Sequence, residues 1–391
     1  MSVVLALLAC GGTENESYLL RVNRALQLCA ADIPNLQLPA ETAAARLANG
    51  GKLWAAGQPS WVSELTGRAG GFMMMKPLVG KKAGTGDVVL YAPDGTPAPG
   101  FGKAYVITFL SKGPTAGTCV YNHAGEAGIS PTLANAIPGW IFTGELIAAL
   151  TRLGKMPVIY ESIGGYGGYA RILQYKDGAI AWHDAPIPPP VPHGVIGKRF
   201  VDTISGMLRR VETEQRSNLD TAGRWAREAK AARHTLYMYS MGHLFPDEVG
   251  KTDIGNMFKS AVWNAGFRNS TPPEDAYGHG DFAVHVGYQH PPSLMLERIT
   301  RAGGKAAYMS VLYDRDYANN PNVVYIDPMW NWPDACVPLE GYDVPLLAAS
   351  GIVHGAIAWE IYRLTQARSS RPRRPDAKPG STLENTPTPI F

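Results

Sequence analysis

The chain has 391 residues, of which 45% are apolar and 18% are charged, and its formal net charge is +3. This composition supports two or three folded domains and excludes a disordered protein. The one basic cluster, at residues 368–378, lies in a Pro-rich tail that is typical of a solvated segment, so the charge pattern does not indicate nucleic-acid binding.

Neither the cysteines nor the N-terminus carries a clear targeting or metal signal. The four cysteines are too sparse and too widely spaced for a disulfide framework or a zinc site. The apolar run MSVVLALLACGG ends in Cys10, as a lipoprotein signal does, but no positive residues precede it. The run is shorter than the roughly 20 apolar residues that span a bilayer, and no later segment is long and uninterrupted enough. We expect a cytoplasmic protein without a membrane span, with an exported lipoprotein anchored through Cys10 as the alternative.

In the first half, the pattern predicts helices across residues 18–49 with a break at Pro34, and then a buried strand at residues 52–56. Two further strands are expected in GDVVLYAP and KAYVITFLS. Residues 113–138 are rich in Gly, Pro, Asn and Ala, which is typical of a loop with a short helix. An amphipathic helix is expected in GWIFTGELIAALTRLG, and a last strand at residues 156–162.

The segment DAPIPPPVPHG, residues 184–194, is the clearest linker, because dense prolines favour an extended polyproline conformation. Beyond it we expect one long helical stretch at residues 199–232, the strand TLYMYS and a helical segment in DIGNMFKSAVWNAG. The strands GDFAVHVGY, KAAYMSVLY and NVVYIDP follow, with the helix PPSLMLERITRAGG among them and SGIVHGAIAWEIYRLT as the final helix. Residues from 366 onward are expected to be disordered.

The alternation of strands and helices predicts parallel sheets covered by helices on both faces. The two halves also repeat one order of elements, with similar strings at matching places, such as GDVVLY and GDFAVHV. We therefore expect an internal duplication of one α/β unit. The expected organisation is an N-terminal arm or signal remnant at 1–17, a first domain at 18–183, a linker at 184–198, a second domain at 199–365 and a tail at 366–391.

The first strand–helix break, GQPSWVSEL, holds candidate ligand-binding residues. Ligands of open parallel sheets bind beyond the carboxyl ends of the strands, where the strand order reverses. Gly57 permits a tight turn, Gln58 follows it, and Ser60 can cap the helix and donate a hydroxyl. Glu64 lies four residues after Ser60 and shares its face. The plainer interpretation is that any such turn favours a Gly and a capping Ser.

The second break supplies Gly242, His243 and Glu248, and the strand GDFAVHVGY leads into His290 and Ser293. If the two strands are neighbours, His243, Glu248 and His290 converge. A histidine beside a carboxylate is suited to proton transfer, so these residues are candidates for catalysis or substrate binding.

On the last predicted helix, Ser350 and His354 are four residues apart and share a face near the helix start. Ser350 is a candidate substrate-binding residue, although capping the helix is its more ordinary role. The helix dipole lowers the pKa of a histidine near the first turn, which favours a neutral imidazole that exchanges protons. His354 is therefore a candidate catalytic residue.

These segments resemble the sugar isomerase (SIS) domain family. Residues 46–71 are similar to the opening of an SIS domain, and the string SELTGR looks most like the phosphoheptose isomerase branch. Residues 281–361 resemble the second SIS strand, its helix and the closing segment. The resemblance implies an α/β fold of two SIS-like three-layer units of flavodoxin type, with parallel sheets, packed as a pseudo-dimer.

In that branch the glutamate before Leu-Thr-Gly-Arg is a catalytic base, which implies this role for Glu64, and a histidine on the last helix can act as the acid, which implies this role for His354. The resemblance thus implies an aldose–ketose isomerase for a sugar or sugar phosphate, without a metal or organic cofactor. A homodimer is compatible with it, since SIS domains commonly pair.

The chain departs from the family pattern where SIS domains bind phosphate. Their Ser/Thr-rich loop is replaced here by YAPDGTP and GYQHPPS. A non-catalytic carbohydrate-binding sensor is therefore the alternative function. A third and weaker interpretation is a metal-dependent hydrolase built on His243, His279 and His290, although their spacing matches no metal motif.

Overall fold

The computed structural model describes residues 16–95, 100–110, 117–163, 167–184, 188–240, 243–261, 272–313, 315–317, 319–331 and 333–367. The predictions for Gly242, for Cys10 and for the tail beyond residue 367 concern residues outside these ranges. The predicted domain boundaries stay a prediction.

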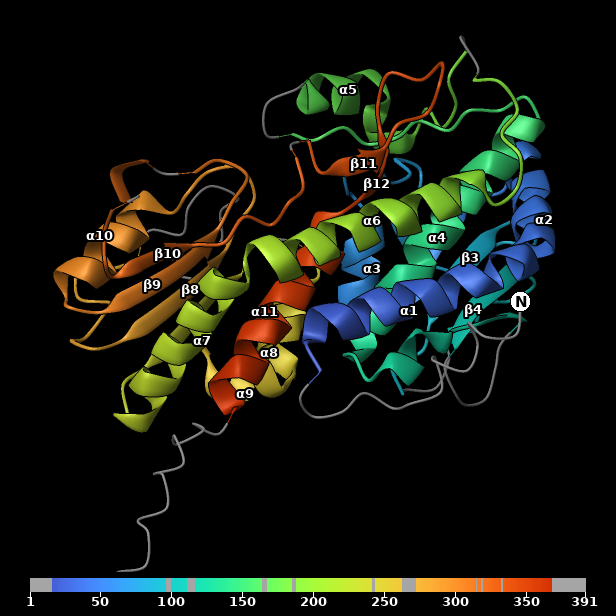
Figure 1. Cartoon of the computed structure of the whole chain (residues 1–391). Helices are drawn as coiled ribbons and strands as arrows, with labels where there is room; N and C mark the ends of the chain where they lie inside the picture. Colours follow the sequence, from blue (N-terminus) through green and yellow to red (C-terminus); the bar gives the residue numbers. More distant parts are fainter. Residues whose placement is uncertain are drawn as a thin grey trace, which may run out of the picture.

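The first half opens with the helices α1 (Tyr18–Asp32) and α2 (Gln37–Ala48), joined by the 3-10 helix η2 (Ile33–Leu36). Its strands are β1 (Leu53–Gly57), β2 (Lys76–Pro77), β3 (Val88–Ala92), β4 (Tyr105–Leu110) and β5 (Thr118–Tyr121), and the short helix α3 (Pro59–Leu65) follows β1. The 3-10 helix η3 (His123–Ala127) leads into the long helix α4 (Pro131–Arg152). A small lobe with α5 (Gly168–Gln174) and η4 (Lys176–Gly178) completes this half (Figure 1).

The second half opens with α6 (Val195–Glu214) and α7 (Arg216–Ala231). Its strands are β6 (Leu236–Ser240), β7 (Lys259–Ser260), β8 (Phe282–Val286), β9 (Lys305–Met309) and β10 (Val323–Tyr325). The helices between them are α8 (Phe245–Lys251), α9 (Asp253–Met257), α10 (Ser293–Arg301) and η5 (Arg315–Tyr317). A two-stranded antiparallel pair, β11 (Ala335–Val337) and β12 (Leu346–Ala348), precedes the last helix, α11 (Ser350–Gln366).

Two five-stranded parallel sheets form the framework. The first has the strand order β2-β1-β3-β4-β5, and the second has the order β7-β6-β8-β9-β10 when it is read from the matching edge. Every strand pair in both sheets is parallel. The predicted α/β class, with parallel sheets flanked by helices, is confirmed, and each strand of one sheet has a counterpart at the same place in the other.

The two faces of the first sheet are covered differently. Val88, Leu90 and Ile107 join the main buried cluster together with residues of α1, α2 and α4. On the opposite face, Val89 and Tyr91 pack with Leu78 and Phe101, which lie outside helices. In the second sheet, α7 and α10 both contact the strands. The buried apolar cluster continues from the first half into α6, α7 and α11, so the halves share one core.

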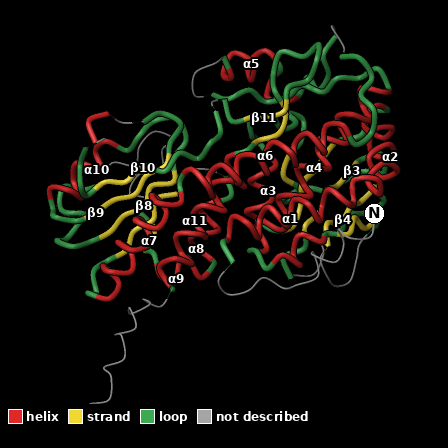
Figure 2. Tube along the Cα trace, viewed as in Figure 1, coloured by secondary structure: helices red, strands yellow, loops and turns green. Residues whose placement is uncertain are grey.

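Matching helices of the two halves pack against each other. The contacts join α1 to α6, α3 to α8 and α4 to α11. Figure 1 shows α1 and α6 side by side, and Figure 2 shows the two sheets at opposite ends of the molecule with helices between them. Pairing of equivalent elements is the geometry of a two-fold interface, here built within one chain.

Some local predictions were wrong. Residues 118–121 form the edge strand β5 inside the expected loop, because the short β-branched run TCVY pairs with β4. Residues 156–162 form no strand and pair only through isolated bridges, outside both sheets. The expected long helix is two helices that break at Gln215, where φ is −110° and ψ is 4°. The segment after Asp253 is the short helix α9 followed by the strand β7.

Candidate functional site

The carboxyl edge of the first sheet begins with a close approach between β1 and β3. Gly57 ends β1 with a φ of +100°, and a Cβ there would lie 1.8 Å from the carbonyl oxygen of Ala92. The backbone N–H of Gln58 donates to that carbonyl oxygen at 2.8 Å. Only glycine combines this conformation with this proximity, so Gly57 directs the chain off the sheet and into α3.

Five uncharged polar residues meet at this edge, and we name them the polar edge: Gln58, Ser60, Asn122, Thr132 and Asn135. Gln58 Nε2 donates to Thr132 Oγ1 at 3.1 Å, and Asn135 Nδ2 donates to Gln58 Oε1 at 3.1 Å. Asn122 Nδ2 donates to Asn135 Oδ1 at 2.9 Å, and Ser60 Oγ lies 3.5 Å from Thr132 Oγ1. Gln58 and Asn135 are half-buried, and the other three are buried. The polar edge therefore presents amide and hydroxyl groups without formal charge.

Glu64, at the end of α3, lies against the other half of the molecule. Its carboxylate is fully buried, accepts a hydrogen bond from Trp140 Nε1 at 3.1 Å and lies 3.3 Å from Arg68 Nη1. Burial raises the pKa of Glu64, and the Arg68 guanidinium opposes this rise. A Cβ on Gly351 would lie 2.2 Å from Glu64 Oε1, so the first turn of α11 touches this carboxylate.

Arg68 links the two halves through a set of buried contacts. The side chain is 2% exposed, and Nη1 donates to the Tyr288 hydroxyl at 2.9 Å. Nη2 donates to Asp334 Oδ2 at 3.0 Å and to Ser350 Oγ at 2.6 Å. We name Glu64, Arg68, Tyr288, Asp334 and Ser350 the Arg68 cluster. One guanidinium of the first half thus binds three groups of the second half.

Asp334 caps the last helix from outside it. Its Oδ1 accepts the backbone N–H groups of Ala349 at 3.2 Å and Ser350 at 2.8 Å, and Ser350 Oγ donates to Oδ2 at 3.0 Å. Asp334 has a φ of +81°, in the left-handed region. A carboxylate of the chain itself therefore lies where the N-terminus of α11 would attract an anion.

His354 is buried one turn further along α11. Trp330 Nε1 donates to His354 Nε2 at 2.9 Å, and the Tyr288 ring lies 6.2 Å away between centroids. Burial and the nearby Arg68 lower the pKa of His354 to about 3, so the imidazole is neutral near pH 7. Glu64 and His354 thus belong to one buried region between the halves, and their predicted catalytic roles stay predictions.

The other predicted residues contact different elements. His243 Nδ1 lies 2.9 Å from the Ser63 carbonyl oxygen, and burial together with Arg68 lowers the pKa of this histidine to about 3. Glu248 is buried and accepts a hydrogen bond from Trp359 Nε1 on α11. His290 and Ser293 are exposed, at the carboxyl end of the second sheet and at the start of α10.

Equivalent positions of the two halves carry related contacts with different chemistry. Trp140 and Trp359 are each the tenth residue of their closing helix, and each donates its indole N–H to the glutamate of its own half. The fifth residues of these helices are Asn135 and His354. Asn135 accepts a hydrogen bond from the side-chain amide of Asn122, which follows β5. His354 accepts one from the indole of Trp330, which follows β10. The first half is therefore lined with amides where the second is filled with aromatic rings.

Sequence reasoning did not find several residues of these clusters: Arg68, Asn122, Thr132, Asn135, Tyr288 and Asp334. For Arg68 a signal was present, because it follows Glu64 by four residues in SELTGR, which is the spacing of a helical ion pair. Thr132 and Asn135 fall within the stretch expected to be a loop, where no periodicity pointed to them.

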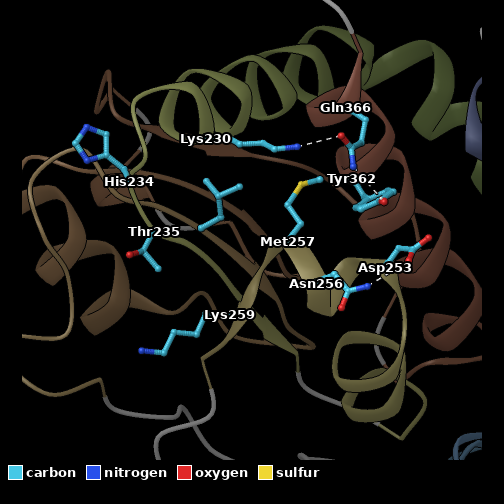
Figure 3. Close-up of a pocket in the computed structure, with 10 residues that line it drawn as sticks. Lys230, His234, Thr235, Asp253, Asn256, Met257, Lys259, Tyr362 and Gln366 are labelled. Atoms are coloured by element: carbon cyan, nitrogen blue, oxygen red, sulfur yellow. Dashed lines mark hydrogen bonds between the residues drawn. The ribbon is translucent and has the colours of Figure 1, made fainter.

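A pocket with a volume of about 370 Å³ lies away from both clusters. It lies at the amino ends of β6 and β7, and Figure 3 shows Lys230 bonded to Gln366 on one side and Asn256 bonded to Asp253 on another. None of the predicted site residues lines it. Among the described residues, no group of three His, Cys, Asp or Glu could hold a metal ion.

One helix of the described part of the chain, α4, is long and apolar enough to cross a membrane, and it is 100% buried within this structure.

No family model matches the chain, and no curated protein matches it in sequence. Among solved structures, the chain is similar to the C-terminal domain of glucosamine-fructose-6-phosphate aminotransferase from Francisella tularensis, at 10% identity and a TM-score of 0.45, with 91% of this chain and 97% of that chain covered. It is also similar to a protein from Salmonella typhimurium LT2 that is named as sugar binding, at 11% identity and a TM-score of 0.44, with 89% and 98% covered. At such identities and scores, function has to be argued from the site itself.

Proposed function

We propose that the protein binds a sugar at the polar edge, as a non-catalytic carbohydrate-binding protein of SIS type. The observation that carries this proposal is the uncharged amide–hydroxyl cluster at the carboxyl edge of a parallel sheet, beside the point between β1 and β3 where the strand order reverses. A carboxamide offers a donor and an acceptor in one plane, which suits the adjacent hydroxyls of a sugar. Gln58 and Asn135 are half-buried, so ligand can reach them.

The buried acid–base pair favours binding over turnover. Glu64 is 0% exposed and His354 is 1% exposed. His354 accepts a hydrogen bond at Nε2, and a pKa of about 3 leaves it without a second proton to give near pH 7. Arg68 and Trp140 hold the Glu64 carboxylate in place.

A second candidate function is aldose–ketose isomerisation with Glu64 as base and His354 as acid. The observation in its favour is that Glu64 of the first half lies against the helix that carries His354, with its pKa raised by burial. In this mechanism Glu64 removes the proton alpha to the substrate carbonyl, and His354 transfers a proton to the carbonyl oxygen.

A ligand panel tests the proposed binding. We expect at least one sugar to raise the melting temperature, since a ligand at 100 times its Kd stabilises the native state by about 2.7 kcal/mol. Calorimetry should show that Gln58→Ala and Asn135→Ala each weaken binding at least about tenfold, which is the loss of one good hydrogen bond. Gln289→Ala is the matched control, because Gln289 is a half-buried carboxamide residue at the corresponding edge of the other sheet. A panel of sugars and sugar phosphates without any shift would refute the proposal.

The same sugars, incubated in deuterated buffer and followed by NMR, distinguish the two functions. Binding alone leaves the proton alpha to the carbonyl in place. Exchange of this proton that disappears in Glu64→Gln would establish the isomerase instead.

A further inference from the structure

We infer that the polar edge takes a neutral, unphosphorylated sugar and discriminates against sugar phosphates. This inference rests on the proposed sugar binding and adds the class of ligand. It follows from four observations on the groups that could hold or repel a phosphate: two helix N-termini, one buried cation and one acidic side chain.

The N-terminus of α4 lies beside the polar edge, and the backbone donors of Ser130 and Leu133 there are already used. The backbone N–H of Leu133 donates to Ser130 Oγ at 3.3 Å, and the backbone N–H of Ser130 donates to the Tyr18 hydroxyl at 2.7 Å. Pro131 supplies no N–H. A phosphate binds at a helix N-terminus through unpaired backbone N–H groups, and the start of α4 has few of them.

The N-terminus of α11 already holds an anion. The Asp334 carboxylate accepts the backbone N–H groups of Ala349 and Ser350 and is itself paired with Arg68. A phosphate at this place would have to displace a carboxylate that is 6% exposed and bonded on both oxygens. At the N-terminus of each closing helix, groups of the chain itself thus bond some of the donors that a phosphate would use.

Two charged side chains among the described residues, Arg68 and Asp94, also disfavour a phosphate at the polar edge. None of its five members is cationic, and the buried cation at the other end of α3, Arg68, is committed to Glu64 and Asp334. The exposed Asp94 follows β3 by two residues, at the edge where the Ala92 carbonyl oxygen accepts from Gln58. Burial and the Asp94 carboxylate raise the pKa of Tyr91, which agrees with a negative charge at the carboxyl end of β3. A phosphate dianion there would be repelled, whereas a neutral sugar would not.

Calorimetry with matched ligand pairs tests the inference: glucose against glucose 6-phosphate, fructose against fructose 6-phosphate, and inorganic phosphate alone. We expect a neutral sugar to bind, its phosphate ester to bind at least about tenfold more weakly, and inorganic phosphate not to compete. Asp94→Asn should reduce the ratio of the two affinities, neutral sugar over its phosphate ester, about fivefold, and it should leave the affinity for the neutral sugar unchanged. Asp275→Asn removes an exposed carboxylate of the other half and is the control.

The outcomes separate this inference from the proposal beneath it. A sugar phosphate that binds more tightly than its parent sugar, and loses that binding in Gln58→Ala, overturns the neutral-ligand inference and leaves sugar binding intact. Failure of every ligand to bind overturns both. An Asp94→Asn variant that leaves the discrimination unchanged contradicts the role of this carboxylate.

Discussion

Replacement of Arg68 by methionine tests whether its buried contacts hold the two halves together. The methionine side chain would keep much of the volume but lack the guanidinium, which leaves the carboxylates of Glu64 and Asp334 buried without their cation. Breaking a buried ion pair by removing one partner costs about 3–5 kcal/mol. The hydrogen bonds to the Tyr288 hydroxyl and to Ser350 are lost as well. We therefore expect the free energy of unfolding at pH 7.5 to fall by about 4 kcal/mol.

The pH dependence of this loss is also fixed by the structure. The pKa of Glu64 is raised in the folded protein, and removal of Arg68 raises it further, because burial then acts without the opposing cation. A carboxyl whose folded pKa is raised stabilises the fold fully below its unfolded pKa, and this contribution is lost as pH rises through the folded pKa. The loss in Arg68→Met should therefore be smaller at pH 4 than at pH 7.5.

Urea denaturation followed by tryptophan fluorescence, at both pH values, measures these changes. The double variant Arg68→Met with Glu64→Gln should recover about 1–3 kcal/mol of the loss, since the amide removes one unpaired buried charge. Arg210→Met, which breaks an exposed pair with Glu214, should change nothing measurable. A loss below about 1 kcal/mol for Arg68→Met, or no recovery in the double variant, would refute the account of this cluster.

Other substitutions test the turn, the buried histidines and the ligand site. Gly57→Ala places a Cβ 1.8 Å from the Ala92 carbonyl oxygen at a φ of +100°, so thermal unfolding should show a loss of at least about 3 kcal/mol, whereas Gly95→Ala, with open space around it, should lose less. His285 is buried with its ring stacked on Tyr239, and burial lowers its pKa to about 3. When the pKa of a histidine is lowered in the folded state, the free energy of unfolding falls as pH falls below the unfolded pKa of about 6.5, by about 2 kcal/mol at pH 5. His285→Phe should therefore lose less stability than the wild type between pH 7.5 and pH 5 in denaturation experiments. Equal acid sensitivity of the two proteins would contradict the neutral state of this imidazole. For the ligand site, Gln58→Ala should weaken sugar binding at least about tenfold and Asp94→Asn should weaken the discrimination against phosphate about fivefold, as calorimetry will show.

The sequence by itself determined the class of fold and the position of the first turn. Short apolar strands that alternate with helices favour parallel sheets packed against those helices, and this local pattern is readable without any partner. The break after β1 was predictable for the same reason, because a glycine between a strand and a helix marks a turn wherever the chain goes next.

Only the tertiary structure decided which side chains meet. Arg68 and Asp334 are separated by 266 positions. The polar edge joins residues 60, 132 and 135 of α3 and α4 to residues 58 and 122, which follow β1 and β5. The proximity of Arg68 and Asp334 depends on packing across the interface between the halves, and that of the polar edge depends on the packing of α3 against α4. Periodicity along the chain encodes neither. The sequence pointed to Glu64 and His354 as individual residues. The packing gave them the buried partners Trp140 and Trp330, which no spacing predicted, because side-chain pairing is set by long-range contacts while secondary structure is set by near neighbours.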